Sequence, residues 1–210
     1  MIPQFGKHNH SSLCDVLAER DPDLKKILDE YGYPPLWTRK QEFASLVHII
    51  LEQQVSLASA KAAFDKLHEY IGKITPSKVL ALSDKELRQC YFSRQKTVYV
   101  RELAKAIVSK KLKLSNLSDL PDELVREQLT AIKGVGNWTV DVYLLFSLQR
   151  LDVFPIGDLA MVNSMKEVKN LSKTSSREEL LSLAENWRPY RSIAAHLLWH
   201  AYIKKRNIKF

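Results

Sequence analysis

The stretch LTAIKGVGNWTVDVYLLFSLQRLDVFPIGD, residues 129–158, decides the fold of this chain. It predicts a helix, a tight hairpin, a second helix and an extended connector that ends at Asp158. Gly134 is suited to end the first helix, because the residue after a helix usually needs a positive φ angle. Gly136 lets the chain turn again, and Asn137 is expected to cap the second helix.

The hairpin has two interpretations. With only Val135 between its glycines, the turn leaves its amides accessible to the backbone of a ligand. The N-terminus of the following helix presents unpaired N–H groups and a partial positive charge, which suit a phosphate. Such contacts hold a nucleic-acid backbone without reading its sequence. The alternative is an ordinary pair of antiparallel helices with a glycine stop, and the two glycines alone favour that alternative.

Size and charge agree with a nucleic-acid partner. The chain has 210 residues and a formal charge of +8, with a pI of about 9.4. These values indicate a polyanionic partner or a well-solvated basic surface. With 45% hydrophobic and 27% charged residues the chain is expected to be globular. Its length allows one domain or two lobes.

Cysteine and histidine usage argues against a metal centre built from side chains. Cys14 and Cys90 lie far apart in the sequence, so they cannot alone build an iron–sulfur cluster or a zinc site and are expected to be reduced, buried thiols. His8 and His10 could share a metal, but two histidines in a polar terminus are more simply solvated. No apolar run approaches a secretion signal or a membrane span, which predicts an intracellular protein.

Apolar residues recur at helical spacing along the chain, and no alternating stretch is long enough for a sheet. We therefore expect an all-α protein of about ten short helices, with only residues 152–156 extended. A polar break at residues 52–55 separates two helices whose apolar stripes face a core. Helix starts are marked by Asp21 before Pro22, by Ser56, and by the capping-box pairs Ser83–Glu86 and Ser176–Glu179.

Four segments resemble the helix-hairpin-helix DNA glycosylases, and most closely the 3-methyladenine DNA glycosylase II branch. They are ILEQQVSLASA (50–60), IKGVGNWTVDVY (132–143), DVFPIGDLA (152–160) and WRPYRSIAAHLLW (187–199). The resemblance extends from about Glu42 to Tyr202, with the motifs in the order found in that family.

The resemblance implies two helical lobes with a cleft between them that receives the damaged base. The middle bundle is expected at 53–153 and contains the helix-hairpin-helix at about 122–149. The second bundle is expected from both chain ends, 1–52 and 154–210.

Asp158 matches the catalytic aspartate of this family. A glycosylase must first extrude the nucleotide from the duplex, and a carboxylate beside the sugar then stabilises its oxocarbenium-like transition state and orients water. On spacing alone, Asp158 precedes an apolar helix and is better explained as its N-cap. The two roles do not exclude each other.

The position of the lysine nucleophile in the lyase members of the family holds Trp138 in this chain, so the resemblance implies hydrolysis without lyase activity. Trp138 and Trp199 match pocket tryptophans, which attract cationic alkylated purines by stacking and cation–π contact. Taken singly, each tryptophan is more often a core residue. The branch has a tyrosine one turn after the first tryptophan; here Val142 takes that place, with Tyr143 beside it as the candidate pocket residue.

The resemblance also implies DNA contacts. Gln54 matches the residue that wedges into the gap left by the extruded base, and a polar helix-ending residue is an equally good interpretation. The hairpin residues expected at the DNA backbone are Lys133, Gly134, Val135, Gly136 and Thr139. Hairpin carbonyls of the family can hold Na⁺ or K⁺, and no organic cofactor is expected. Arg191 is expected to contact DNA or to pair with a carboxylate, and the pairing is favoured.

The sequence therefore predicts a monofunctional glycosylase that removes alkylated purines of the 3-methyladenine type from double-stranded DNA in base excision repair. It is expected in the cytoplasm of a prokaryote or the nucleus of a eukaryote, without an obligatory protein partner. The alternative is a catalytically silent helix-hairpin-helix protein that binds DNA as a damage sensor.

Overall fold

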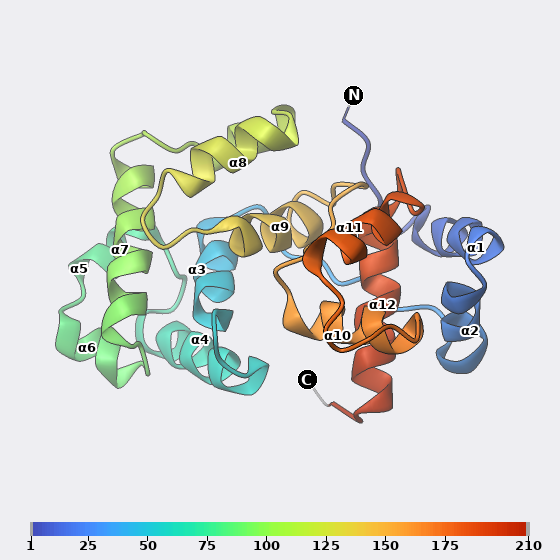
Figure 1. Cartoon of the computed structure of the whole chain (residues 1–210). Coiled ribbons are helices and arrows are strands. Elements are labelled where there is room, and N and C mark those ends of the chain that lie inside the picture. The colour runs from blue at the N-terminus through green and yellow to red at the C-terminus, as the bar shows by residue number, and fades with distance from the viewer. Residues whose placement is uncertain (1, 209–210) are drawn as a thin grey trace. The chain divides into compact units, whose positions relative to one another are not determined.

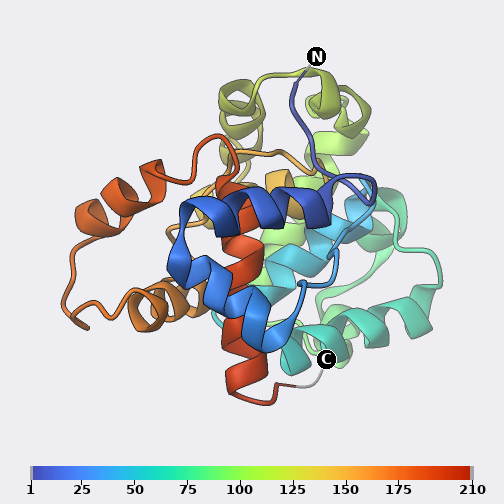
Figure 2. The ribbon, with the colours of Figure 1, turned by 90° about the vertical axis from the view of Figure 1, so that its right-hand side faces the viewer.

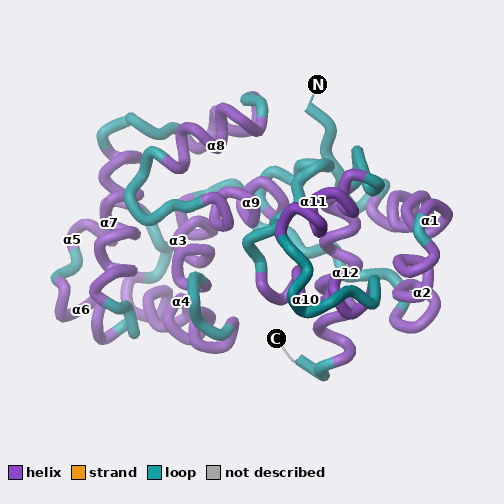
Figure 3. The backbone as a smooth tube through the Cα atoms, in the orientation of Figure 1, coloured by secondary structure: helices purple, strands orange, loops and turns teal. Residues whose placement is uncertain are grey.

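The computed structural model describes residues 2–208, and this part of the chain is all-α, as predicted. Figure 3 shows helices joined by loops, with no strand among these residues. The helices are α1 (His10–Arg20), α2 (Pro22–Tyr31), α3 (Phe43–Glu52), α4 (Leu57–Ile71), α5 (Pro76–Ala81), α6 (Asp84–Gln89), α7 (Arg94–Val108), the 3₁₀ helix η1 (Leu114–Asp119), α8 (Asp122–Thr130), α9 (Asn137–Phe146), α10 (Leu159–Val168), α11 (Arg177–Glu185) and α12 (Arg191–Lys205). Between residues 2 and 208 no helix is both long and apolar enough to cross a membrane.

Side-chain caps start several helices where the sequence predicts them. The Asp21 carboxylate accepts hydrogen bonds from two backbone N–H groups of α2, and both predicted capping boxes form. Asn137 differs, because α9 already begins at this residue. Its side-chain oxygen instead accepts a hydrogen bond from Arg126 at 3.1 Å. The prediction that Asn137 caps α9 is therefore wrong by one position.

The chain divides into two compact units. Among the described residues, the middle unit is Arg39–Tyr143, and the terminal unit comprises residues 2–38 and 144–208. These boundaries differ from the predicted middle bundle at 53–153. Helix α3 belongs to the middle unit because it packs on α4 and α7. The chain from Leu144 belongs to the terminal unit because Leu145 lies in the core of that unit.

Helix α12 is the centre of the terminal unit. Every residue from Ser192 to Ala201 is buried, and α1, α2 and α10 pack on this helix (Figure 1). Seen from the side in Figure 2, α1 and α2 lie in front of α12. A helix that is apolar on all sides is stable only when it is enclosed, and its three neighbours provide that enclosure.

The middle unit is organised around α3 and α7. Helix α3 packs on α4 and α7, and α7 also carries α5 and α6. Seven residues of α3 are buried, namely Phe43, Ser45, Leu46, Val47, Ile49, Ile50 and Leu51. This packing holds the end of α3, where the polar break begins.

Two predictions about single residues have different outcomes. Cys14 and Cys90 are free, buried thiols, as predicted, and burial raises the pKa of Cys14 to about 12. His10, in contrast, is not solvated. It is only 4% exposed, and its Nε2 lies 3.0 Å from His196 Nδ1 on α12.

Candidate active site

The hairpin between α8 and α9 requires glycine at position 134. Gly134 has a φ of +92°, and a Cβ atom at this position would lie 2.0 Å from Cγ of Tyr99. The Val135 N–H donates to the Ile132 carbonyl at 3.0 Å and closes the turn. Both the backbone angle and the tyrosine ring exclude any side chain at position 134.

Gly136 is different, because the fold does not require it to be glycine. Its φ lies outside the left-handed region, and a Cβ atom there would meet nothing within 4 Å. Gly136 is exposed and directly precedes α9, whose N-terminal N–H groups suit an anion. Lys133 is also exposed. Open space beside a helix N-terminus is the arrangement that a phosphate needs.

Arg126 braces the two helices of the hairpin, and sequence reasoning did not identify it. Its guanidinium donates to Asn137 Oδ1 at 3.1 Å and to Asp141 Oδ1 at 2.5 Å. These bonds join α8 to the first turns of α9. The i, i+4 spacing of Asn137 and Asp141 on one helix face was the available signal.

Two predicted hairpin residues have buried side chains. Val135 is 4% exposed and Thr139 is 1% exposed. The hydroxyl of Thr139 accepts a hydrogen bond from Gln53 Nε2 at 2.9 Å. Because its side chain faces the protein, Thr139 could reach a DNA backbone only through its main chain, and that contact stays a prediction. Val135 can reach a ligand only through its main chain.

Two of the hairpin carbonyls, among which a Na⁺ or K⁺ site is predicted, already accept protein hydrogen bonds. Gly134 O accepts from Gln53 Nε2 at 2.9 Å, and Ile132 O accepts from Val135 N–H. Each carbonyl keeps a second lone pair, so a cation could use them from the other side. Among the side chains of residues 2–208 there is no group of three or more His, Cys, Asp or Glu that could hold a metal.

Gln54 follows α3 and is exposed. Its φ is +56°, in the left-handed region that residues other than glycine rarely adopt. This geometry ends the helix and presents the side chain to solvent. The position suits both the helix-ending role and the wedge role.

Asp158 is the N-cap of α10, as its spacing predicts. Its Oδ1 accepts the Met161 N–H at 2.9 Å and the Trp199 Nε1–H at 3.0 Å. The residue is half-buried. The carboxylate is thus held in one orientation by a helix terminus and by an indole from α12.

Trp199 binds Asp158 through its indole N–H and exposes little of its ring to solvent. Trp199 is 8% exposed, and its ring stacks on Phe146 with centroids 5.3 Å apart and planes 28° apart. Trp138, in the first turn of α9, is half-buried. Tyr143 is 0% exposed, and burial raises the pKa of its hydroxyl. In this structure the Tyr143 ring is part of the core, and its role in a base pocket stays a prediction.

The connector that carries Asp158 is clamped to the first turn of α12. Arg191 Nε donates to Asp152 Oδ1 at 2.8 Å, and Arg191 Nη2 donates to the Asp152 carbonyl oxygen at 3.0 Å. Ser192 Oγ donates to Arg150 O at 2.6 Å and accepts the Val153 N–H at 2.9 Å. The prediction that Arg191 pairs with a carboxylate is confirmed. Helix α12 therefore holds both ends of the connector, at Asp152 and at Asp158.

Beneath Trp199 lies a neutral histidine pair. His196 contacts the rings of Trp37, Phe146 and Trp199 at centroid distances of 5.3, 5.7 and 6.3 Å. Burial lowers the pKa of His196 far below 6.5, and the nearby His10 lowers it further. Burial also lowers the pKa of His10. His196, which packs against the Trp199 ring, and its neighbour His10 are therefore uncharged near neutral pH.

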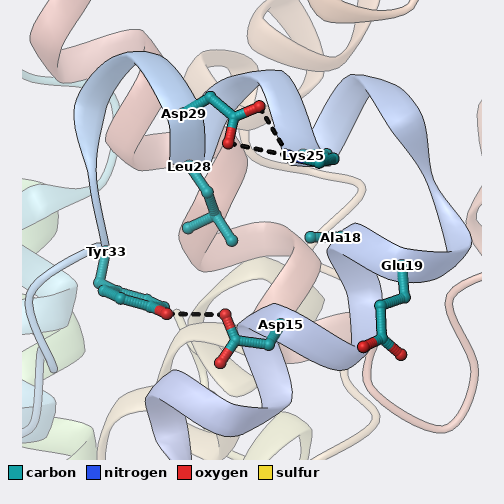
Figure 4. A pocket seen from close by; sticks show the side chains of 7 residues that line it. All are labelled: Asp15, Ala18, Glu19, Lys25, Leu28, Asp29 and Tyr33. Carbon is teal, nitrogen blue, oxygen red and sulfur yellow. Dashed lines mark hydrogen bonds and ion pairs between the residues drawn. The ribbon is translucent and has the colours of Figure 1, made fainter.

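A separate cavity of about 370 Å³ lies between α1 and α2. Figure 4 shows that Asp15, Glu19 and Asp29 line it, with the Tyr33 hydroxyl donating to Asp15 at 2.7 Å. Its three carboxylates outnumber its one cation, Lys25, which is paired with Asp29, so this cavity is unsuited to a phosphate. None of the predicted site residues lines it.

Comparison with known proteins adds an independent finding. Residues 47–189 match the family model described as HhH-GPD superfamily base excision DNA repair protein. A Bacillus subtilis relative named DNA-3-methyladenine glycosylase is 26% identical over 87% of this chain, and the chain spans 64% of that protein. The crystal structure of a Bacillus halodurans DNA-3-methyladenine glycosidase has a TM-score of 0.79 and 29% identity, covering 98% of this chain and 95% of that one.

A second solved structure contains nucleic acid. The Schizosaccharomyces pombe 3-methyladenine DNA glycosylase, solved in complex with abasic DNA, has a TM-score of 0.80 and 27% identity. The match covers 93% of this chain and 97% of that chain.

Proposed function

The chain belongs to the HhH-GPD superfamily of base excision DNA repair proteins, and from that premise we propose that it is a monofunctional glycosylase that hydrolyses the N-glycosidic bond of alkylated purines. It is a DNA glycosylase for alkylated bases, and its partner is DNA, as its relatives and their DNA complex indicate. The catalytic residue, the hydrolytic mechanism and the DNA contacts are the parts that we propose.

The observation that carries the proposal is the fixed carboxylate of Asp158. Trp199 and the Met161 N–H both bind its Oδ1, so the carboxylate has a set direction before substrate arrives. A carboxylate that is already oriented stabilises a developing oxocarbenium ion without reorganisation during the reaction. In the proposed step, the bond from the anomeric carbon to the purine nitrogen breaks with its electron pair leaving on the base, and Asp158 stabilises the resulting sugar cation. Water adds to the anomeric carbon, and the proton that this water loses passes to solvent.

Simple hydrolysis is favoured over lyase chemistry. Lyase action needs an amine that forms a Schiff base with the sugar. Trp138 occupies the position of the lysine nucleophile, and an indole nitrogen cannot serve as that amine. Lys133 precedes the turn and is exposed, which suits a phosphate contact. The protein is therefore expected to release the free base and to leave an intact abasic site.

The hairpin supplies the proposed grip on the DNA backbone. Gly136 is glycine although the free fold has room for a side chain there, and this is explained if a phosphate approaches its amide closely. The +8 charge supplies the sequence-independent attraction. The alternative of a silent damage sensor rests on Asp158 as a helix cap, a role that would preserve an aspartate without catalysis.

One experiment tests the proposal. The purified protein is incubated with methylated duplex DNA, and free bases and alkali-labile sites are quantified, with borohydride trapping as the assay for a Schiff base. We expect release of methylated purines, no trapped adduct, and loss of release in Asp158→Asn. Asparagine caps helices as well as aspartate does, so this variant should stay folded.

A matched control separates catalysis from capping. Ser176→Ala removes the cap of α11 and should leave base release unchanged. Undiminished release by Asp158→Asn would refute the catalytic assignment. Absence of release by the wild-type protein, with duplex binding retained, would favour the damage sensor.

A further inference from the structure

The turn after α3 is anchored residue by residue within the middle unit. Lys96, on α7, donates from Nζ to the Leu51 carbonyl oxygen. The Arg39 guanidinium donates to both carboxylate oxygens of Glu52, at 3.0 and 2.5 Å. These two anchors tie the last turn of α3 to two separate segments.

The third anchor is Gln53, which reaches the hairpin. Its Nε2 donates to Gly134 O at 2.9 Å and to Thr139 Oγ1 at 2.9 Å. A primary amide has two N–H donors, so one bond goes to the hairpin turn and the other to the first turns of α9. Thr139 is 1% exposed, so this contact is protected from competing water.

The anchors stop at Gln53, and the next residue projects outward. Gln54 is exposed with a left-handed backbone, and it is followed by Val55 and Leu57, which are 45% and 47% exposed. A left-handed conformation at a residue other than glycine persists only where its surroundings enforce it. The two Gln53 bonds to the hairpin are made by the residue immediately before Gln54 in the chain.

We propose that Gln53 is a positioning residue that couples the hairpin to Gln54, so that the grip on the DNA backbone aims Gln54 into the base stack. The inference rests on the proposed function, in which the hairpin holds phosphates and Gln54 fills the gap left by the extruded base. Bound phosphates hold the hairpin, and with it Gly134 and Thr139, in place. The Gln53 amide is hydrogen-bonded to both residues and thereby holds the adjacent Gln54 in a fixed position. Without these two bonds the hairpin still binds, but Gln54 is no longer held at the depth that opens the duplex.

The test separates backbone binding from base opening in the full-length protein. Variants Gln53→Leu and Thr139→Val remove both bonds and one bond, respectively. The matched control is Gln41→Leu, because Gln41 Nε2 also donates to a backbone carbonyl, that of Leu114, elsewhere in the same unit. Each protein is measured for affinity to undamaged duplex, for fluorescence of 2-aminopurine placed opposite an abasic analogue, and for the single-turnover rate of 7-methylguanine release.

We expect Gln53→Leu to bind undamaged duplex within about twofold of wild type, while the 2-aminopurine signal and the release rate fall roughly tenfold, as expected for the loss of one to two net hydrogen bonds. Thr139→Val should lose a smaller part of both signals, and Gln41→Leu should lose neither. If Gln53→Leu does not fold, the same separation of opening from binding in Thr139→Val decides the question.

Three results would overturn the coupling. The first is wild-type opening and release in Gln53→Leu. The second is an equal loss of duplex binding and of opening, which would mean that Gln53 only keeps the hairpin folded. The third is the absence of any 2-aminopurine signal with wild-type protein. Opening by wild type without base release would instead refute the proposed glycosylase and leave the coupling intact.

Discussion

The two hairpin glycines offer a matched pair of substitutions whose effects should be opposite. Gly134→Ala places a methyl group on a left-handed backbone and against the Tyr99 ring, at 2.0 Å. Gly136→Ala places the same methyl group in open space. The first glycine should therefore matter for folding and the second for DNA binding.

The magnitudes follow from the geometry. For Gly134→Ala, the left-handed backbone costs about 1–2 kcal/mol and the overpacking about 1–3 kcal/mol, which together lower the thermal midpoint by roughly 5–15 °C. For Gly136→Ala, a reduced entropy of the unfolded chain leaves the stability unchanged or raises it by up to about 1 kcal/mol. The added methyl group should nevertheless keep a phosphate from approaching the amide of residue 136. Loss of this one charge-assisted bond should weaken duplex binding by roughly tenfold or more.

The assay needs only two measurements on each protein. Thermal unfolding is followed by circular dichroism, and affinity is followed by fluorescence anisotropy with a labelled, undamaged duplex at fixed salt. Wild-type affinity in a folded Gly136→Ala protein would refute the phosphate contact at this turn. A thermal midpoint of Gly134→Ala equal to that of wild type would refute the packing role of Tyr99.

Four further predictions follow from the charges and contacts. Trp199→Phe keeps an aromatic ring but removes the hydrogen bond to Asp158. Single-turnover base release should therefore fall by about tenfold, with unchanged duplex affinity. An unchanged rate would show that the indole N–H does not contribute to base release. Arg191→Gln should slow release while Arg188→Gln, which removes a more exposed partner of the same carboxylate, should not; equal rates in the two variants would contradict the clamp. Duplex affinity should fall linearly in a plot of log K against log salt, and a flat response would contradict phosphate contacts. The thermal midpoint should fall as the pH drops from about 7 to about 5, because His196 binds a proton in the unfolded chain over this range but stays neutral while it is buried in the folded protein. A midpoint that is constant over this range would be inconsistent with the lowered pKa.

Local features of the structure were predictable from the sequence because the interactions that make them span only a few residues. Asp21 starts α2, and Ser83 and Ser176 form capping boxes. Each cap joins a side chain to a backbone group within three residues, and a short polar pattern before an apolar run identifies it. The same reasoning placed Asp158 at the start of α10.

Burial along α9 was not predictable from periodicity. Every residue from Thr139 to Leu145 is buried, so this helix lacks a solvent face whose position could be read from the sequence. A helix enclosed on all sides carries no amphipathic pattern, so the burial of the Thr139 and Tyr143 side chains could not be predicted from the sequence. The contacts that position the candidate site residues also escaped prediction, since Gln53 and Gly134 are 81 residues apart and Asp158 and Trp199 are 41 residues apart.

The proposed double use of Asp158, as helix cap and as catalytic carboxylate, would have an evolutionary consequence. One oxygen of this carboxylate accepts hydrogen bonds from the first turn of α10 and from the Trp199 indole N–H. An amide oxygen could accept both bonds. A single nucleotide change from an aspartate codon to an asparagine codon would then silence the chemistry without unfolding the protein. One substitution could in this way convert the enzyme into a folded protein that binds lesions without excising them, and the reverse substitution could restore its activity.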